Sequence, residues 1–242
     1  MANFYISMVS VAIDLGARAF AGMTDKTGRE GAFLHSLRVE KLVAKTGAGE
    51  VACAAALLHD VIEDTTVTVP DIMTAFAAYP TEKVDHMLSI ILSVTRGYFH
   101  RETKTMVFSP PYPETVCDCK TSKCTKASHT YDKESYREFV MRSKRNPLGR
   151  ILKIADITDN SSAARVEGLS EDEKGIVEER YVPALAYLKD DKAVEYFTPR
   201  QLARICRYCS QPFSSHTEGS RQCPSHSLLF DDSQRNTFKG VR

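Results

Sequence analysis

The chain has 242 residues, of which 43% are hydrophobic and 26% are charged, and its formal net charge at pH 7 is +1. This composition is that of a globular protein with a full hydrophobic core, and the near-neutral charge excludes a global electrostatic field that would recruit nucleic acid or an anionic membrane. The sequence contains no apolar run of about 18 residues that would span a bilayer. Its seven cysteines, without a secretion signal, indicate a reducing cytoplasmic location where thiols bind metal more often than they form disulfides.

Two helices are predicted at the start of the chain. The first runs from about Phe4 to Ala21. Apolar residues at three-and-four spacing predict its core-facing side: Ile6, Val9, Ile13, Ala17 and Phe20. After a polar loop, the second helix runs from Phe33 to about Thr46 and ends before Gly47. It places His35 among apolar residues, where a lone histidine is more often a core residue than a ligand.

The stretch from Leu57 to Thr65 has the strongest functional signal in the chain. It follows a run of small, apolar residues, 50–56, which predicts a buried helix. The motif contains one imidazole and three carboxylates, those of His59, Asp60, Glu63 and Asp64. In a continuous helix these side chains would stack one turn apart, in i and i+4 pairs. Ionised carboxylates beside apolar residues are costly unless a cation or hydrogen-bond donors compensate them, so a metal ion is favoured over an exposed helix end with solvated charges.

The rest of the first half also predicts helices. One is expected from about Asp71 to Ala78 and another from about Glu82 to Thr95. The second has apolar residues at core spacing, namely Val84, Leu88, Ile91 and Leu92. Because no segment alternates with period two over the length of a strand, we predict an all-α body.

Helical patterns resume after a proline-rich interruption near residue 110. A helix is predicted from Ser135 to Arg145, with Tyr136, Phe139 and Val140 facing inward. The next one, 150–160, is apolar at first and turns acidic at Asp156, so it repeats the arrangement of a carboxylate after a buried helical run. A last helix is expected from Ser170 to Tyr187, kinked at Pro183.

The C-terminal tail from residue 199 has a different character. It contains two short pairs of metal-binding residues separated by thirteen residues, Cys206 and Cys209, then Cys223 and His226. Such a C-x2-C…C-x2-H pattern is typical of a tetrahedral zinc site. A segment of this size with few apolar groups cannot fold on hydrophobic burial alone, so we expect Zn²⁺ to supply its folding free energy. His216 can replace His226 as the fourth ligand.

A second cysteine cluster lies in the interruption between the helices. It consists of Cys117, Cys119, Cys124 and His129. The spacing allows a second zinc site, and it equally allows a loop that binds no metal.

Several of these motifs together resemble the HD-domain phosphohydrolases, and in particular the (p)ppGpp hydrolase domain of the RelA/SpoT alarmone proteins. The stretches that carry the resemblance are 33–39 with His35, 56–65 with His59 and Asp60, 93–96, and 152–156 with Asp156 followed by Asn160. The first stretch departs from the family, since Ser36 stands where proline is usual. The resemblance covers residues 4 to 190, apart from the cysteine insert, and excludes the tail.

The resemblance implies an HD-domain helical bundle with a single Mn²⁺. Its ligands would be His35, His59, Asp60 and Asp156. Glu63 and Asp64 would orient and deprotonate the attacking water, and Lys26 and Asn160 would contact the nucleotide. A donor set of two imidazoles and two carboxylates, without a thiol, agrees with Mn²⁺ in preference to a softer metal. The implied reaction is hydrolysis of the 3′-pyrophosphate of (p)ppGpp to GDP or GTP and pyrophosphate.

One difference from the family leaves the identity of the nucleotide substrate open. The family has an arginine beside Lys26 that packs on the guanine base, and this chain has Asp25 there. A carboxylate cannot provide that cationic stacking. The alternative is therefore an HD phosphohydrolase for another nucleotide, such as a dNTP, a nucleoside monophosphate or NADPH. A second alternative is that the chain is not an enzyme and that it is a zinc-finger module that binds nucleic acid or a protein partner.

The predicted organisation follows from these patterns. We expect a phosphohydrolase domain over residues 1–195 with an insert at about 109–130, a zinc-binding module over 200–230, and a tail over 231–242. The expected partner is a nucleotide, with no membrane contact, and the zinc tail can add nucleic-acid or protein contacts.

Overall fold

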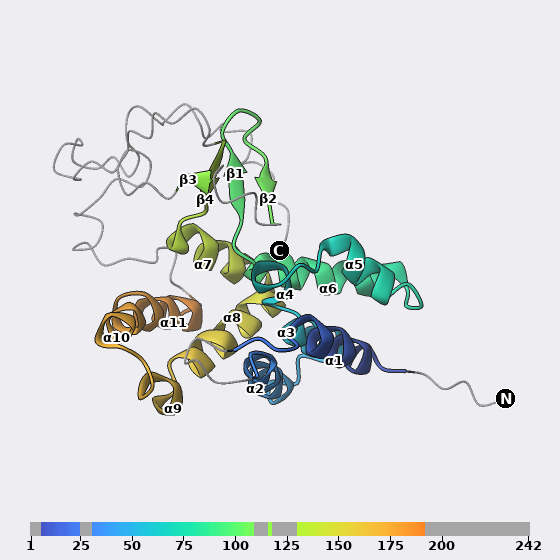
Figure 1. Cartoon of the computed structure of the whole chain (residues 1–242), viewed down its shortest axis with the longest axis horizontal. Helices are drawn as coiled ribbons and strands as arrows, with labels where there is room; N and C mark the ends of the chain where they lie inside the picture. Colours follow the sequence, from blue (N-terminus) through green and yellow to red (C-terminus); the bar gives the residue numbers. More distant parts are fainter. Residues whose placement is uncertain (1–5, 25–30, 109–115, 118–129, 192–242) are drawn as a thin grey trace.

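The computed structural model of the chain describes residues 6–24, 31–108, 116–117 and 130–191. Over these residues the fold is a bundle of α-helices with one small sheet at its edge (Figure 1). The predicted all-α class is confirmed for the body of the protein. Within the described ranges, none of the helices combines the length and apolar character needed to cross a membrane.

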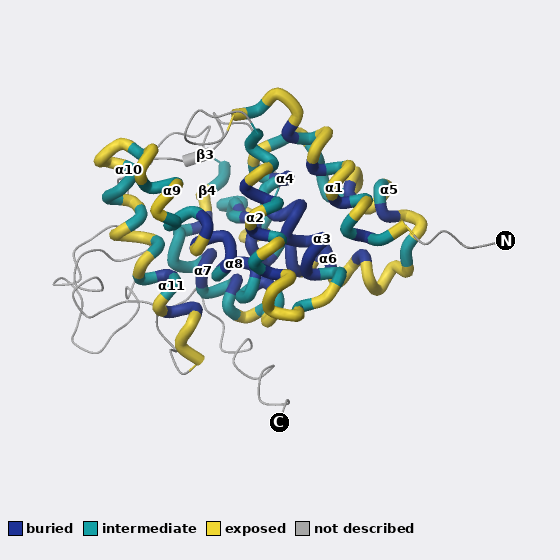
Figure 2. Tube along the Cα trace, turned by 90° about the horizontal axis from the view of Figure 1, so that it is seen from below, coloured by how far each residue is buried: buried dark blue, intermediate teal, exposed yellow. Residues whose placement is uncertain are grey.

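Helix α3 (Glu50–Leu57) lies at the centre of the first half of the bundle. It packs against α1 (Met8–Ala19), α2 (Phe33–Ala44) and α6 (Thr81–Val94). All of its residues from Ala52 to Leu57 are buried, which Figure 2 shows as a dark segment between its neighbours. Its run of alanines leaves room for helices to approach from several sides, so the small apolar residues that predicted a buried helix also explain its central place.

Helix α1 buries only part of the predicted face: Phe20 at its end is buried and Val9 packs against the core, as predicted. The buried positions are Met8, Ala12 and Gly16, whereas Ile13 is 41% exposed. The prediction for Ile13 was therefore wrong, and so were those for Ile6 and Ala17, which are also exposed. The small residues face inward because α1 lies very close to its neighbours: a Cβ added at Gly16 would lie 2.3 Å from Cε2 of Phe33.

The helix that carries the acidic motif is not continuous. Helix α3 ends at Leu57, and after a turn a short helix α4 (Val61–Asp64) begins. His59 and Asp60 lie in that turn, so the motif is not one continuous helix. Asp60 is the N-cap of α4 and its carbonyl accepts from the N–H of Asp64, so these two residues are still one helical turn apart. The break changes the direction of the chain directly after the buried run. As a result the polar groups of the turn face the interior of the bundle.

The remaining helices of the first half follow the prediction closely. Helix α5 (Val69–Ala75) begins with a capping box, in which the Thr68 and Asp71 side chains each accept from the other's backbone N–H. Helix α6 buries Val84, Leu88 and Ile91 as predicted.

The second half of the bundle is built on α8 (Pro147–Asn160), which contacts α2, α6, α7 (Tyr136–Arg145) and α11 (Val182–Lys189). The Asn146 side chain caps α8 by accepting from the N–H groups of Leu148 and Gly149. A small apolar cluster joins these helices, consisting of Val140, Ile157, Ala184, Tyr187 and Leu188. This packing places the acidic end of α8 beside α2.

The last predicted helix is interrupted. A short α9 (Ala163–Val166) precedes α10 (Glu171–Ile176), and a π-helical turn, Val177–Tyr181, joins α10 to α11. The turn lies directly before Pro183, whose ring lacks an N–H donor and clashes with the preceding helical turn. The predicted irregularity at Pro183 therefore takes the form of a widened turn.

A four-stranded sheet was not predicted. Its strands are β1 (Tyr98–His100), β2 (Met106–Val107), β3 (Val116–Cys117) and β4 (Tyr131–Lys133), in the order β2-β1-β4-β3. Strand β1 pairs antiparallel with β2 and β4, and β3 pairs parallel with β4. In the sequence, β1 and β2 precede the predicted insert, β3 lies within it and β4 follows it, so the departure from helical structure begins nearer residue 98 than 109.

Candidate metal centre

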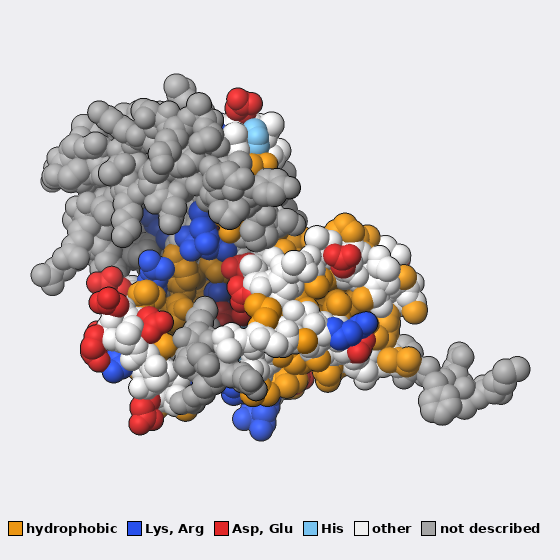
Figure 3. All heavy atoms as spheres, viewed as in Figure 1, with side chains coloured by type: hydrophobic (Ala, Val, Ile, Leu, Met, Phe, Trp, Pro, Cys, Tyr) orange, Lys and Arg blue, Asp and Glu red, His pale blue; other side chains and the backbone are white. Residues whose placement is uncertain are grey.

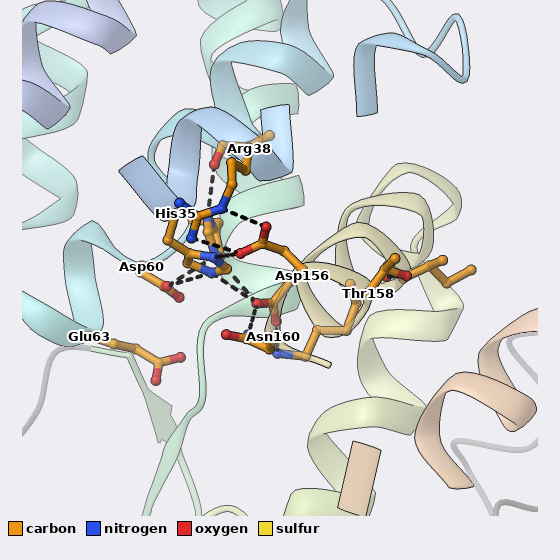
Figure 4. Close-up of polar contacts among 12 residues, drawn as sticks. His35, Arg38, Asp60, Glu63, Asp156, Thr158 and Asn160 are labelled. Atoms are coloured by element: carbon orange, nitrogen blue, oxygen red, sulfur yellow. Dashed lines mark hydrogen bonds and ion pairs between the residues drawn. The ribbon is translucent and has the colours of Figure 1, made fainter. Parts of the chain in front are cut away.

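Four polar side chains from three separate parts of the chain converge inside the bundle (Figure 4). His35 comes from α2, His59 and Asp60 from the turn after α3, and Asp156 from α8. His35 Nε2 lies 3.2 Å from Asp156 Oδ1 and 3.6 Å from Asp60 Oδ2. His59 Nε2 lies 3.1 Å from Asp60 Oδ2 and 3.8 Å from Asp156 Oδ1. Both imidazoles therefore present the same ring nitrogen to the same two carboxylates.

This arrangement can hold a metal ion. One ligand atom each of His35, His59 and Asp156 lies within 4.8 Å of the others, and all three residues are buried. Within the described part of the chain, His59 Nε2 is buried without a hydrogen-bond partner. A buried polar atom without a partner is costly, and a cation at the shared centre would remove that cost. Nitrogen and carboxylate donors without a thiol fit a divalent metal ion.

The outer nitrogens of the two imidazoles are also fixed. His59 Nδ1 donates to the backbone carbonyl of Ala56, at 2.8 Å. His35 Nδ1 lies 2.8 Å from Oδ2 of Asp159, a buried carboxylate on α8. In each ring a hydrogen bond at Nδ1 leaves Nε2 directed at the shared centre. The sequence analysis gave no role to Asp159.

The charges in the cluster keep its carboxylates ionised. Burial raises the pKa of Asp60 and of Asp156, but for each carboxylate the neighbouring groups together outweigh burial and lower it: His59 and His35 beside Asp60, and Lys153, His35 and His59 beside Asp156. Burial lowers the pKa of His59, and the two carboxylates that face it outweigh burial and raise it. Because Asp60 and Asp156 stay negative at neutral pH, they can bind a cation.

A buried lysine stands beside this centre. Lys153 Nζ lies 2.8 Å from Asp156 Oδ2 and 4.2 Å from the centre of the Phe139 ring. Its aliphatic stem therefore packs in the core while its charge compensates one oxygen of Asp156. The other oxygen of Asp156 remains directed at the imidazoles.

Of the two predicted catalytic acids, Glu63 is the one that points into the site. It is half-buried on α4, and its carboxylate accepts a hydrogen bond from the backbone N–H of Arg96. Burial raises the pKa of Glu63, the charge of Asp60 raises it further, and the Arg96 N–H partly offsets both. Figure 4 shows its carboxylate on the same side of the cluster as Asp60. Asp64 is exposed at the end of α4.

Asn160, predicted to contact substrate, lies beside the cluster. Its amide nitrogen donates to Asp156 Oδ1 at 2.5 Å. Among the four converging side chains, that of Asp60 is 29% exposed and the others are at most 9% exposed, so the centre is nearest to solvent at Asp60. Figure 3 shows a hollow in the surface, with Lys and Arg side chains on one side of it and Asp and Glu side chains on the other.

The other predicted sites cannot be compared with the structure. Lys26 lies outside the described residues, and so do Cys119, Cys124 and His129 of the insert and Cys206, Cys209, Cys223 and His226 of the tail. Cys117 is described only as part of the backbone of β3.

Comparison with family models finds no match, and comparison with curated proteins finds none either. Among solved structures, the chain is similar to one described as a metazoan ortholog of SpoT that hydrolyzes ppGpp and plays a role in starvation responses. The two share 14% sequence identity with a TM-score of 0.49, and the match covers 81% of this chain and 92% of the other.

Proposed function

We propose that this chain is a metal-dependent phosphohydrolase of the HD type that acts on a nucleotide. The observation that carries the proposal is the convergence of His35, His59, Asp60 and Asp156 around one buried centre. They come from three segments that lie far apart in sequence, and only the fold brings their Nε2 and carboxylate oxygens together.

The four converging residues would hold a divalent ion, for which we propose Mn²⁺. When bound, such an ion lowers the pKa of a coordinated water and offsets negative charge on phosphate oxygens. The orphaned Nε2 of His59 and the absence of a thiol from this donor set support an ion of this kind.

Glu63 is the proposed general base. Its carboxylate is directed toward the centre from the neighbouring helix, and the Arg96 N–H holds one of its oxygens. The other oxygen is left to accept a proton from the attacking water. Burial raises the pKa of this carboxyl, which brings it nearer to the pH at which it works. Asp64, which is exposed, is proposed to assist at the outer edge of the site.

The substrate we propose is (p)ppGpp, hydrolysed at its 3′-pyrophosphate to GDP or GTP and pyrophosphate. The support comes from the motif around His59 and Asp60, which is specific for the alarmone hydrolases among HD proteins. Lys26 and Asn160 would contact the nucleotide. Asp25, in place of an arginine, favours a second candidate: the same hydrolytic chemistry on a nucleotide with another base or phosphate pattern.

The test is a panel of nucleotides incubated with Mn²⁺ and purified full-length chain, with products separated by anion-exchange chromatography. We expect pyrophosphate and GDP from ppGpp, and loss of activity in His59→Ala. His86→Ala removes an exposed histidine of α6 and serves as the matched control with full activity.

The outcomes separate the candidates. Turnover of another nucleotide with ppGpp left intact would select the second candidate. If no nucleotide is turned over while the protein shows salt-dependent binding to RNA or DNA, the hydrolase proposal is wrong and a non-catalytic binding module is favoured.

A further inference from the structure

Asp159 lies behind one of the two imidazoles of the candidate centre. It is 7% exposed, and its Oδ2 is 2.8 Å from His35 Nδ1, on the side of the ring that faces away from Asp60 and Asp156. An ionised carboxylate can only accept, so the ring nitrogen donates its proton. His35 Nε2 then keeps a free lone pair toward the centre.

The carboxylate of Asp159 is itself held in place. Arg38 donates to both of its oxygens, from Nε to Oδ1 at 2.7 Å and from Nη2 to Oδ2 at 3.1 Å. Arg165 Nη1 adds a contact to Oδ2 at 3.3 Å. A forked guanidinium contact of this kind fixes the plane of a carboxylate as well as its position. Two arginines also compensate a charge that would otherwise be costly to bury.

The four residues of this arrangement are paired across two helices. On α2, Arg38 follows His35 by three residues, and on α8, Asp159 follows Asp156 by three. Residues three apart share one face of a helix. The inner pair, His35 and Asp156, meets at the centre, and the outer pair, Arg38 and Asp159, meets behind it. Figure 4 shows Arg38 on the opposite side of His35 from Asp60.

The other imidazole is fixed differently. His59 Nδ1 donates to a backbone carbonyl of its own turn, that of Ala56, and so needs no side-chain partner. His35 lies in the first turn of α2, and the partner of its Nδ1 is the Asp159 side chain from α8. On this side of the ring the orientation of His35 therefore depends on Asp159, which can be replaced while the four converging side chains are all kept.

We propose that Asp159, held by Arg38, is a positioning residue that orients His35 and fixes its proton on Nδ1, so that Nε2 binds the metal ion. This inference rests on the proposed metal centre. Carboxylates that hold a ligand histidine in this way raise the basicity of the ligand, and their loss commonly weakens metal binding about ten- to a hundred-fold.

The experiment measures Mn²⁺ binding to metal-free, full-length protein by the electron paramagnetic resonance signal of free Mn²⁺, with no substrate present. Asp159→Asn keeps the shape of the side chain and removes its charge, and we expect the Kd for Mn²⁺ to rise about ten- to a hundred-fold. Asp14→Asn is the matched control: it breaks an exposed aspartate–arginine pair on α1, and the Kd is expected to stay unchanged.

If Asp159 only linked α2 to α8 and did not position His35, a different result would be expected. Arg38→Met removes the main link between the helices but leaves Asp159 against His35. Under our proposal it weakens Mn²⁺ binding less than Asp159→Asn does. Equal Kd values for the two variants would overturn the positioning role.

The tautomer gives a test that needs no variant at position 159. In protein saturated with diamagnetic Mg²⁺ and labelled with ¹⁵N, His35 is expected to show a protonated Nδ1 and an unprotonated Nε2, with its signals assigned by their loss in His35→Gln. A proton on Nε2 would overturn the proposal. If the unmodified chain binds no divalent ion, the proposed function fails together with this inference, whereas tight binding that Asp159→Asn leaves unchanged rejects the inference alone.

Discussion

The carboxylate of Glu63 accepts a hydrogen bond from the backbone N–H of Arg96, which is 33 residues away in the sequence. Arg96 is in turn held by the residue that follows β4, because its Nε donates to the carbonyl of Glu134 at 2.7 Å. The same Glu134 accepts from the N–H of Gly97 at 3.0 Å. The proposed base is thus fixed by the segment that leads from α6 into the sheet.

Replacement of Glu63 by glutamine should lower activity and raise stability. Because Glu63 is the proposed general base, its replacement is expected to reduce kcat about 10²- to 10⁴-fold. Burial raises the pKa of Glu63 above its value in the unfolded chain, so ionising it opposes folding. Below the pKa that Glu63 has in the unfolded chain, Glu63→Gln should leave the free energy of unfolding unchanged. As pH rises from there through the higher pKa of Glu63 in the folded protein, the variant should become more stable than the unmodified chain.

This prediction is checked by thermal unfolding in EDTA between pH 4 and 8, together with the pH dependence of kcat for the unmodified enzyme. Activity that requires an ionised Glu63 falls as pH is lowered through its raised pKa. A variant with lower Tm at pH 8 than the unmodified chain would contradict the proposed cost of the buried charge.

The ion pair between Glu134 and Arg142 should stabilise the protein far more than the exposed pair between Asp132 and Arg101. Glu134 is 1% exposed and accepts from Arg142 Nε and Nη2, at 2.9 and 2.7 Å. Glu134→Gln removes the buried member of the pair and leaves the half-buried guanidinium of Arg142 without its counter-charge, at a cost of about 3 kcal/mol. Asp132→Asn, whose carboxylate is 55% exposed, should cost at most about 1 kcal/mol. Urea unfolding of both variants measures the difference, and equal losses would contradict it.

Gly16→Ala should destabilise the bundle. The new Cβ would lie 2.3 Å from the ring of Phe33, so α1 or the ring must move, at a cost of about 1–3 kcal/mol. Gly175→Ala in α10 is the matched control, since an added Cβ there meets nothing within 4 Å. That variant should gain up to about 1 kcal/mol from helix propensity. Opposite signs of the change in Tm are expected, and a stabilising Gly16→Ala would show that α1 does not pack closely against α2.

The tail is expected to bind one zinc ion for each chain. This prediction comes from the spacing of Cys206, Cys209, Cys223 and His226, which lie outside the described residues. Elemental analysis of protein purified without added metal should find about one zinc, with a second only if the insert also forms a site. Zinc that persists after Cys206 and Cys223 are both replaced by serine would count against the tail site.

The sequence predicted the residues of the centre because each of them lies in a short local pattern. His59 and Asp60 follow a buried alanine-rich run, and Asp156 follows another apolar helical run. Whether these segments meet is a property of the tertiary fold, and the distances of 3.1 to 3.8 Å among their ligand atoms come only from the structure. The roles of these residues, and of Glu63 and Asp64, stay predictions.

The features that the sequence missed depend on contacts between distant segments. Asp159 is an ordinary polar residue of a helix until α2 brings His35 and Arg38 to it. The strands are two or three residues long, too short to show period-two alternation. The face of α1 was misassigned because the buried side of a closely packed helix is lined by small residues such as Ala12 and Gly16, and hydrophobic patterns favour large ones.

The dependence of the centre on α2 and α8 has a consequence for biosynthesis. His35 and Asp156 are separated by 121 residues. While the ribosome is still making the chain, the histidines emerge long before their acidic partner on α8, and domains assemble as their segments become available. A nascent chain that stops short of α8 therefore lacks Asp156, and any ion that the proposed centre binds would be captured only after α8 has been made.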